Sequence, residues 1–116
     1  MLEEAPGGVD VKREGRKAVV VPSGDVVASV VQTLKPKLKE LVHDGVDTMV
    51  FDLARATIVD SIGIGLLVAA HNSVQKTGGA ISVIHASREL VDLFKSLRLD
   101  QRFAVIETWD PPAGKA

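Results

Sequence analysis

A buried strand that runs into a glycine-bearing helix start is the feature that most constrains this fold. Residues Thr48 to Leu53 form a nearly continuous apolar run, which is typical of a strand buried on both faces at the centre of a sheet. The pair Asp60-Ser61 then precedes an apolar run with two glycines, residues 62–68. Both residues of the pair are good helix caps, because their side-chain oxygens can accept from the free N–H groups of a first turn. The stretch predicts a strand-to-helix junction, with a helix that opens at Asp60-Ser61.

The first turn of that helix suits an anion. A glycine inside a helix costs roughly 1 kcal/mol against alanine, so Gly63 and Gly65 indicate a close backbone approach or a packing need. Free N–H groups and the positive end of the helix dipole both favour a phosphate at a helix N-terminus. A phosphoserine at Ser61 is therefore physically reasonable, although a plain N-cap is the commoner use of serine at such a position.

Extended and helical segments alternate along the rest of the chain. Val9 and Val11 alternate with polar neighbours, Glu14-Gly15 marks a turn, and residues 17–21 form an apolar β-branched run, which together predict a hairpin. Apolar residues at helical spacing predict a helix from about Ser29 to His43, bent near Pro36. The pattern as a whole predicts a single α/β domain over residues 9–110, with a mixed sheet of about five strands opened by the hairpin and flanked by helices. The remaining expected elements are the Ser61 helix ending at Thr77-Gly78-Gly79, a strand over 80–85, a helix capped by Ser87 with apolar residues at 90, 91, 94 and 97, and a strand over 103–106.

Composition excludes several kinds of site. The 116 residues carry a formal net charge of −1 and no cysteine. This charge gives no basic field for nucleic acid, and the lack of cysteine rules out disulfides and thiolate metal sites. His43, His71 and His85 fall in separate elements without a ligand spacing, so we expect them to be solvated or capping. We therefore expect neither a metal nor a cofactor, and no group of residues indicates a catalytic centre.

The ends of the chain and one set of lysines are expected to be solvated. Residues 1–8 and 111–116 should be flexible, and Trp109 beside the second segment should fold back onto the domain. The acidic N-terminus is unlike a secretory signal and no apolar run is long enough to span a bilayer, so we expect no membrane insertion and a cytoplasmic location. The lysines at 35, 37 and 39 interleave with the apolar face of the first helix and are interpreted as a solvated face.

Over nearly its whole length the chain resembles the STAS domain family. The central motif of that family is a strand ending Asp-Leu-Ser/Ala, followed by Asp-Ser-Ser-Gly-Leu-Gly. It corresponds here to Asp52-Leu53-Ala54 and to residues 60–65, D-S-I-G-I-G. The stretches at 22–25, 76–79 and 97–100 are also similar. Ser61 falls on the serine that is phosphorylated in the antagonists of this family.

The resemblance implies an anti-sigma-factor antagonist, which is a bacterial regulator of transcription and not an enzyme. Such a protein binds an anti-sigma factor that is also a serine kinase; phosphorylation of Ser61 would end the binding, and a PP2C-type phosphatase would restore it. The protein itself would be a monomer or weak dimer. The residues expected to form the switch and partner-binding surface are Asp25, Asp60, Ser61, Ile62, Gly63 and Ile64.

Two departures from the family pattern leave alternatives open. The first is Ile62, which stands where the family has a second serine. Ser61 is therefore the main candidate to accept the phosphate and Thr57 a weaker one, while Ile62 becomes a candidate docking contact. The second is Arg98, which stands where glycine is common. One alternative function is a constitutive accessory subunit of a lipid or anion transporter complex, in which Ser61 is only a cap. Another is a receiver domain phosphorylated on Asp52, but that would need an acidic pair at an earlier strand end, where residues 21–25 offer a single carboxylate.

Overall fold

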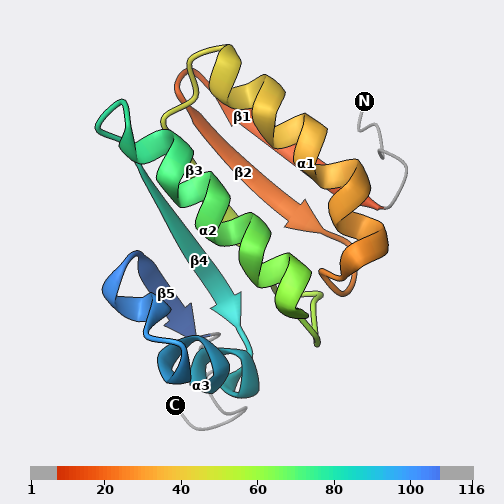
Figure 1. Cartoon of the computed structure of the whole chain (residues 1–116). Coiled ribbons are helices and arrows are strands. Elements are labelled where there is room, and N and C mark those ends of the chain that lie inside the picture. The colour runs from red at the N-terminus through yellow and green to blue at the C-terminus, as the bar shows by residue number, and fades with distance from the viewer. Residues whose placement is uncertain (1–7, 108–116) are drawn as a thin grey trace, which may run out of the picture.

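The computed structural model describes residues 8–107 (Figure 1). The expectations for residues 1–7, for 111–116 and for Trp109 lie outside these residues. Gly8, also expected to be flexible, is described, and its carbonyl accepts from the Ser23 N–H at 2.6 Å. The expected hairpin, helices and strands are all present, with bounds within a residue or two of those predicted. In chain order the elements are β1 (Val9–Glu14), β2 (Lys17–Pro22), α1 (Ala28–His43), β3 (Thr48–Asp52), α2 (Ser61–Gln75), β4 (Ala80–Ala86), α3 (Arg88–Ser96), the 3-10 turn η1 (Leu99–Gln101) and β5 (Ala104–Glu107).

The five strands form one mixed sheet in the order β1-β2-β3-β4-β5. The hairpin pair β1 and β2 is antiparallel, and the other neighbouring pairs are parallel. Each helix carries the chain to the next strand in the same direction across the sheet. Because such crossovers are right-handed, crossovers that all step the same way put their helices on the same face. Figure 1 shows α1 and α2 lying side by side over that face.

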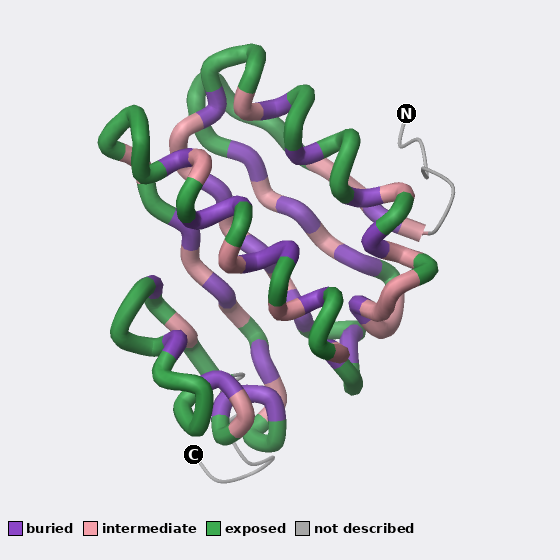
Figure 2. Tube along the Cα trace, in the orientation of Figure 1, coloured by how far each residue is buried: buried purple, intermediate pink, exposed green. Residues whose placement is uncertain are grey.

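Strand β3 lies at the centre of the sheet, as predicted, but it is covered on one face only. Met49 and Phe51 point into the core and are almost fully buried, whereas Thr48, Val50 and Asp52 are half-buried. Figure 2 shows the same alternation of buried and intermediate residues along the neighbouring strands. The expectation of a strand buried on both faces was wrong, because the same-direction crossovers leave the second face without a helix among residues 8–107.

Helix α1 begins one residue earlier than predicted and runs through Pro36 without a break. A proline removes the N–H that would bond the carbonyl four residues before it, here the carbonyl of Gln32. Both residues are on the exposed side of the helix, where water can satisfy that carbonyl. The proline therefore stands where its missing donor costs least.

The core between the sheet and the helices is mostly aliphatic, because aromatic residues make up only 3% of the sequence. One predicted core position is wrong: Leu97 follows α3 as its C-cap residue and is 48% exposed, because the helix ends one residue before it. No helix among residues 8–107 is long and apolar enough to cross a membrane. The buried residues of the three helices are Val31, Leu34, Leu38 and Leu41 of α1, Gly63, Leu66, Leu67, Ala70, His71 and Val74 of α2, and Leu90, Val91 and Phe94 of α3.

Arg98 adopts a left-handed backbone conformation between α3 and η1, with φ of 60°. Glycine is the residue that enters this region without a steric penalty, whereas a side chain costs roughly 1–2 kcal/mol. The glycine that is common at this position in the family is thereby explained, and the arginine of this chain is a local source of strain.

Candidate functional site

Ser61 is the first residue of α2 and is exposed. The helix start is where the sequence predicts it, and its cap is Asp60: one carboxylate oxygen, Oδ1, accepts from the Gly63 N–H at 2.8 Å. The carbonyl of Asp60 also accepts the first helical bond, from Ile64 N–H at 2.9 Å. Within residues 8–107 the Ser61 hydroxyl has no hydrogen-bond partner. Asp60 therefore does the capping, and the hydroxyl of Ser61 remains free for chemistry at the surface.

Asp60 also joins the start of α2 to the start of α1. Its second carboxylate oxygen, Oδ2, accepts from the N–H of Ala28, the first residue of α1, at 3.1 Å. The N-cap residue of α1, Val27, supplies no side-chain hydrogen bond of its own. The backbone N–H of Asp60 donates to the carbonyl of Val26 at 3.2 Å. One carboxylate thus satisfies N–H groups at two helix N-termini, and the positive ends of both helices meet beside Ser61.

Asp25 holds together the two loops that carry these helix starts. Its Oδ1 accepts from the backbone N–H of Thr57 at 2.8 Å and of Ile58 at 3.0 Å. Next to it, Val26 and Val59 form an isolated parallel bridge between the loops. The loop after β2 is therefore tied to the loop after β3, which fixes the position of Ser61 relative to α1.

The two glycines at the start of α2 have different roles. A Cβ on Gly63 would overlap the carbonyl oxygen of Val26 and lie 2.9 Å from Cγ1 of Val59. The predicted close backbone approach is confirmed here, because only a bare Cα lets the helix pack against the loop after β2. A Cβ on Gly65 would meet nothing within 4 Å. That residue is exposed one turn after Ser61, so packing within residues 8–107 does not require a glycine there.

Two large apolar side chains flank Ser61 in the sequence and are exposed to solvent. Ile58 is 53% exposed and Ile62 is 51% exposed. Among residues 8–107 these are two of the four large hydrophobic residues that are exposed to this extent, the others being Leu97 and Ile106. We call Thr57, Ile58, Ser61 and Ile62 the Ser61 surface; all four are exposed. The Ser61 surface therefore exposes two large apolar side chains as well as the free hydroxyl.

The residues predicted for the switch surface differ in how much a partner could reach. Asp25, Asp60 and Ile64 are half-buried, Gly63 is buried, and Ser61 and Ile62 are open to solvent. Asp25 and Asp60 have structural hydrogen bonds to the two loops, as described above. Thr57 is exposed as well, but it lies in the loop before α2, where its N–H donates to Asp25, and not at a helix N-terminus whose free N–H groups could bond a phosphate.

The carboxylate of Asp52 has two neighbouring partners at the end of β3. Its Oδ1 accepts from the Ala54 N–H at 3.0 Å and lies 3.0 Å from Nδ1 of His85. His43 and His85 are exposed, whereas His71 is 6% exposed and faces Phe103, with ring centroids 5.7 Å apart. The expectation that all three histidines are solvated or capping was wrong for His71. Its position on the inner face of α2 turns the ring into the core, and Nδ1 finds no partner among residues 8–107.

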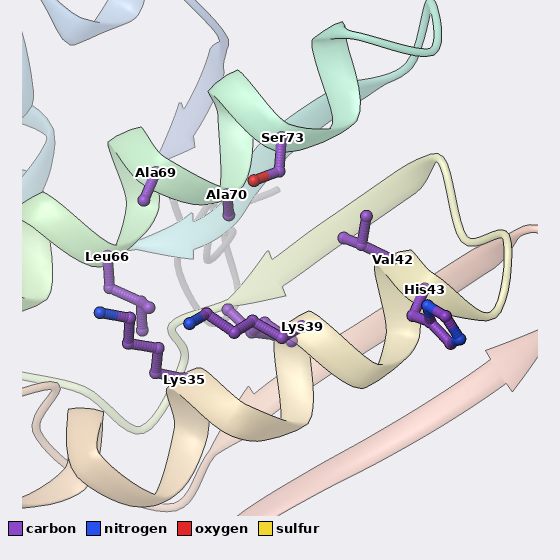
Figure 3. A pocket seen from close by; sticks show the side chains of 9 residues that line it. Lys35, Lys39, Val42, His43, Leu66, Ala69, Ala70 and Ser73 are labelled. Carbon is purple, nitrogen blue, oxygen red and sulfur yellow. The ribbon is translucent and has the colours of Figure 1, made fainter.

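One surface feature is absent from the sequence-based predictions. A groove with a volume of about 320 Å³ separates α1 from α2, and Lys35 and Lys39 lie along it (Figure 3). The alternation of lysines with apolar residues indicated a solvated face. A signal was present in retrospect: the lysines at 35 and 39 are four residues apart and share one helix face, while Lys37 lies on another.

Comparison with known proteins gives a family and a fold. Residues 8–110 match the STAS domain. The anti-sigma-B factor antagonist of Bacillus subtilis (strain 168) is 30% identical over 86 residues, which are 74% of this chain and 78% of that protein.

Two solved structures are similar in fold. An anti-sigma factor antagonist from Mycobacterium paratuberculosis gives a TM-score of 0.75 at 22% identity, covering 93% of each chain. The phosphorylated form of SpoIIAA, a cell fate determinant of Bacillus, gives a TM-score of 0.71 at 16% identity, covering 84% of this chain and 90% of that chain. The match over residues 8–110 spans the whole five-stranded sheet and its helices. This chain therefore belongs to the STAS domain family.

Proposed function

We propose that this protein is an anti-sigma-factor antagonist that works by partner switching. In its unphosphorylated form it binds an anti-sigma factor that is also a serine kinase, phosphorylation of Ser61 ends the binding, and a PP2C-type phosphatase reverses it. The observation that carries the proposal is a free serine hydroxyl at a helix start capped by Asp60, in a surface that also exposes Ile58 and Ile62. The protein acts as a regulator of transcription in the cytoplasm and has no catalytic step of its own.

A phosphate at Ser61 opposes docking through its charge. It adds about −1.5 to −2 charges next to the carboxylate of Asp60, in a surface whose large side chains are Ile58 and Ile62. A partner that covers these isoleucines would have to remove water from the phosphate as well. A charge left buried and unpaired in an interface costs about 3 kcal/mol, which corresponds to roughly a 150-fold loss of affinity. Phosphorylation would therefore be sufficient to release the partner.

The same helix start can hold the phosphate without unfolding the domain. The N-termini of α1 and α2 both donate to the carboxylate of Asp60, so two positive dipole ends lie next to the residue that precedes Ser61. The N–H groups of Ser61 and Ile62, which have no partner among residues 8–107, are free to bond phosphate oxygens. The switch would therefore act at the surface and leave the sheet and core unchanged.

The comparisons support the proposal at the level of the family. A relative with 30% identity is an anti-sigma-B factor antagonist, and a protein of similar fold has been solved in a phosphorylated form. Ser61 is exposed at the first position of α2, where a kinase active site could reach it.

Phosphate mapping tests the proposal directly. The purified chain and its Ser61→Ala and Thr57→Ala variants would be incubated with ATP and an anti-sigma factor of the serine-kinase type from the same organism. Intact mass followed by peptide mapping should place one phosphate on Ser61 in the parent chain and in Thr57→Ala, and none in Ser61→Ala. A kinase that phosphorylates its own control substrate but leaves Ser61 unmodified would overturn the proposal. Recovery of the chain in a membrane complex, with an affinity for that complex that Ser61→Asp leaves unchanged, would favour the constitutive transporter subunit instead.

A further inference from the structure

Helices α1 and α2 border an open groove that begins beside the Ser61 surface. On both helices the lining residues recur at spacings of three and four, so each helix presents one face to the groove. Figure 3 shows Lys35 and Val42 of α1 and Leu66 of α2 directed into the space between the two helices. We call this feature the α1–α2 groove. The residues that line its deepest part are Lys35, Leu38, Lys39, Val42 and His43 of α1, and Leu66, Ala69, Ala70 and Ser73 of α2.

The groove continues toward Ser61. A second hollow shares Lys35 and Lys39 with the first, follows α1 back to Ala28 and is bordered by Ile62. Ile62 is also part of the Ser61 surface, so the two surfaces are continuous. The stretch of α1 along the groove, residues 28–43, has 16 residues and is about 24 Å long at 1.5 Å per residue.

The chemistry of the groove is apolar at its base and cationic along one rim. Leu38, Val42 and Leu66 provide apolar walls, and Figure 3 shows Lys35 and Lys39 extending from α1 toward α2. Neither hollow has a carboxylate among its lining residues. Within residues 8–107 neither of these lysines forms an ion pair, whereas Lys37, outside the groove, lies 3.6 Å from a carboxylate oxygen of Glu40.

We propose that the α1–α2 groove is the second part of the partner's docking surface, and that it accepts an amphipathic helix with an acidic flank. A groove walled by two helix faces accepts a third helix through apolar residues at spacings of three, four and seven. The unpaired ammonium groups of Lys35 and Lys39 would meet carboxylates beside that apolar stripe. The length of the groove matches about four turns of helix. The inference rests on the proposed function, because the partner of the Ser61 surface would carry this helix.

A synthetic helix tests the groove without the partner. The probe is a side-chain-stapled peptide of about 16 residues, with leucines at positions i, i+3, i+4 and i+7 and glutamates beside them. A matched peptide carries lysine in place of each glutamate. Each would be titrated to about 1 mM into the full-length, ¹⁵N-labelled chain, and amide shift changes would be followed by NMR.

The acidic peptide should shift amides of α1 and α2 around the groove, and the lysine peptide should bind at least about tenfold more weakly. The double variant Lys35→Glu/Lys39→Glu should lose about tenfold in affinity for the acidic peptide. The control variant Lys37→Glu/Lys95→Glu changes the net charge equally outside the groove and should bind as the parent does. If the first double variant fails to fold, Lys35→Gln/Lys39→Gln should still show about a threefold loss.

Several results would overturn the inference. These are no groove shifts with the acidic peptide, equal binding of the two peptides, or equal losses in the groove and control variants. Groove shifts that grow with protein concentration alone would show that a second copy of the chain is the occupant, and groove shifts with oleate but not with the peptide would assign the site to a lipid. The probe requires neither kinase nor phosphate, so its failure would count against the groove and leave the Ser61 switch standing.

Discussion

Replacing Gly63 by alanine is expected to destabilise the protein, whereas the same replacement at Gly65 is expected to stabilise it. Both glycines lie in the first turns of α2, so alanine removes the same intrinsic helix cost of roughly 1 kcal/mol at each position. The surroundings differ. The new Cβ at Gly63 would overlap the carbonyl oxygen of Val26, while the new Cβ at Gly65 would meet nothing within 4 Å.

The expected size of the effect at Gly63 follows from what must move. The Val26 carbonyl is backbone and accepts the N–H of Asp60 at 3.2 Å, so it cannot rotate away as a side chain would. A shift of α2 would also lengthen the hydrogen bond from the Ala28 N–H to Asp60, now 3.1 Å. Overpacking of this kind costs about 1–3 kcal/mol. Weakening a hydrogen bond to a charged group, whose complete loss would cost about 1.5–3 kcal/mol, adds about 1 kcal/mol. After the gain in helix propensity, a net loss of about 2 kcal/mol is expected.

Urea unfolding followed by circular dichroism at 222 nm measures both variants against the parent chain. Gly63→Ala should lower the free energy of unfolding by about 2 kcal/mol, and Gly65→Ala should raise it by about 0.5–1 kcal/mol. In thermal unfolding, each kcal/mol corresponds to roughly 4–8 °C in Tm for a domain of this size. Equal changes in the two variants, or a gain in stability for Gly63→Ala, would refute the close packing of α2 against the loop after β2.

Three further substitutions test other parts of the structure by the same unfolding measurement. Arg98→Gly should stabilise the chain by about 0.5–1 kcal/mol, because glycine adopts the left-handed backbone at φ of 60° without strain and this outweighs its greater entropy in the unfolded state. A loss of stability would contradict that backbone conformation. Asp60→Ala should lower the free energy of unfolding by about 2–3 kcal/mol, since two helix N-termini lose a charged acceptor, and Asp60→Asn should recover part of this loss. A loss below about 0.5 kcal/mol for Asp60→Ala would exclude the shared cap. His71→Leu should stabilise the chain by about 1 kcal/mol, because it removes a buried ring nitrogen that has no hydrogen-bond partner among residues 8–107. Clear destabilisation would contradict a ring nitrogen without a partner.

The order and type of the elements could be predicted because their signals are local. Periodic apolar residues, the cap at Asp60 and the glycines after α2 act within a few residues of each other. The position of β3 at the centre of the sheet followed from its apolar run. The open second face of the sheet did not follow, because it depends on the direction of three successive crossovers, which no single stretch of sequence encodes.

The candidate site was predictable in part for the same reason. Ser61 and its cap are adjacent in sequence, and the match to a family motif identified them. The bond between Asp60 and Ala28 joins residues 32 positions apart, and the two bonds that Asp25 accepts from the loop before α2 span 32 and 33 positions. Such contacts appear only when the loops are brought together in three dimensions. The groove along Lys35 and Lys39 is likewise a product of the spacing between two helices.

The most direct test of the central claim compares the affinity of the two forms of the chain for the same partner. The unphosphorylated chain and the chain phosphorylated on Ser61 would be titrated into the anti-sigma-type kinase by isothermal calorimetry, with a non-hydrolysable ATP analogue to prevent turnover. The phosphorylated form should bind at least about 100-fold more weakly. Its circular dichroism and Tm should match those of the unmodified chain, since the phosphate lies on the surface. Affinities within about threefold of each other would contradict a phosphate switch at Ser61.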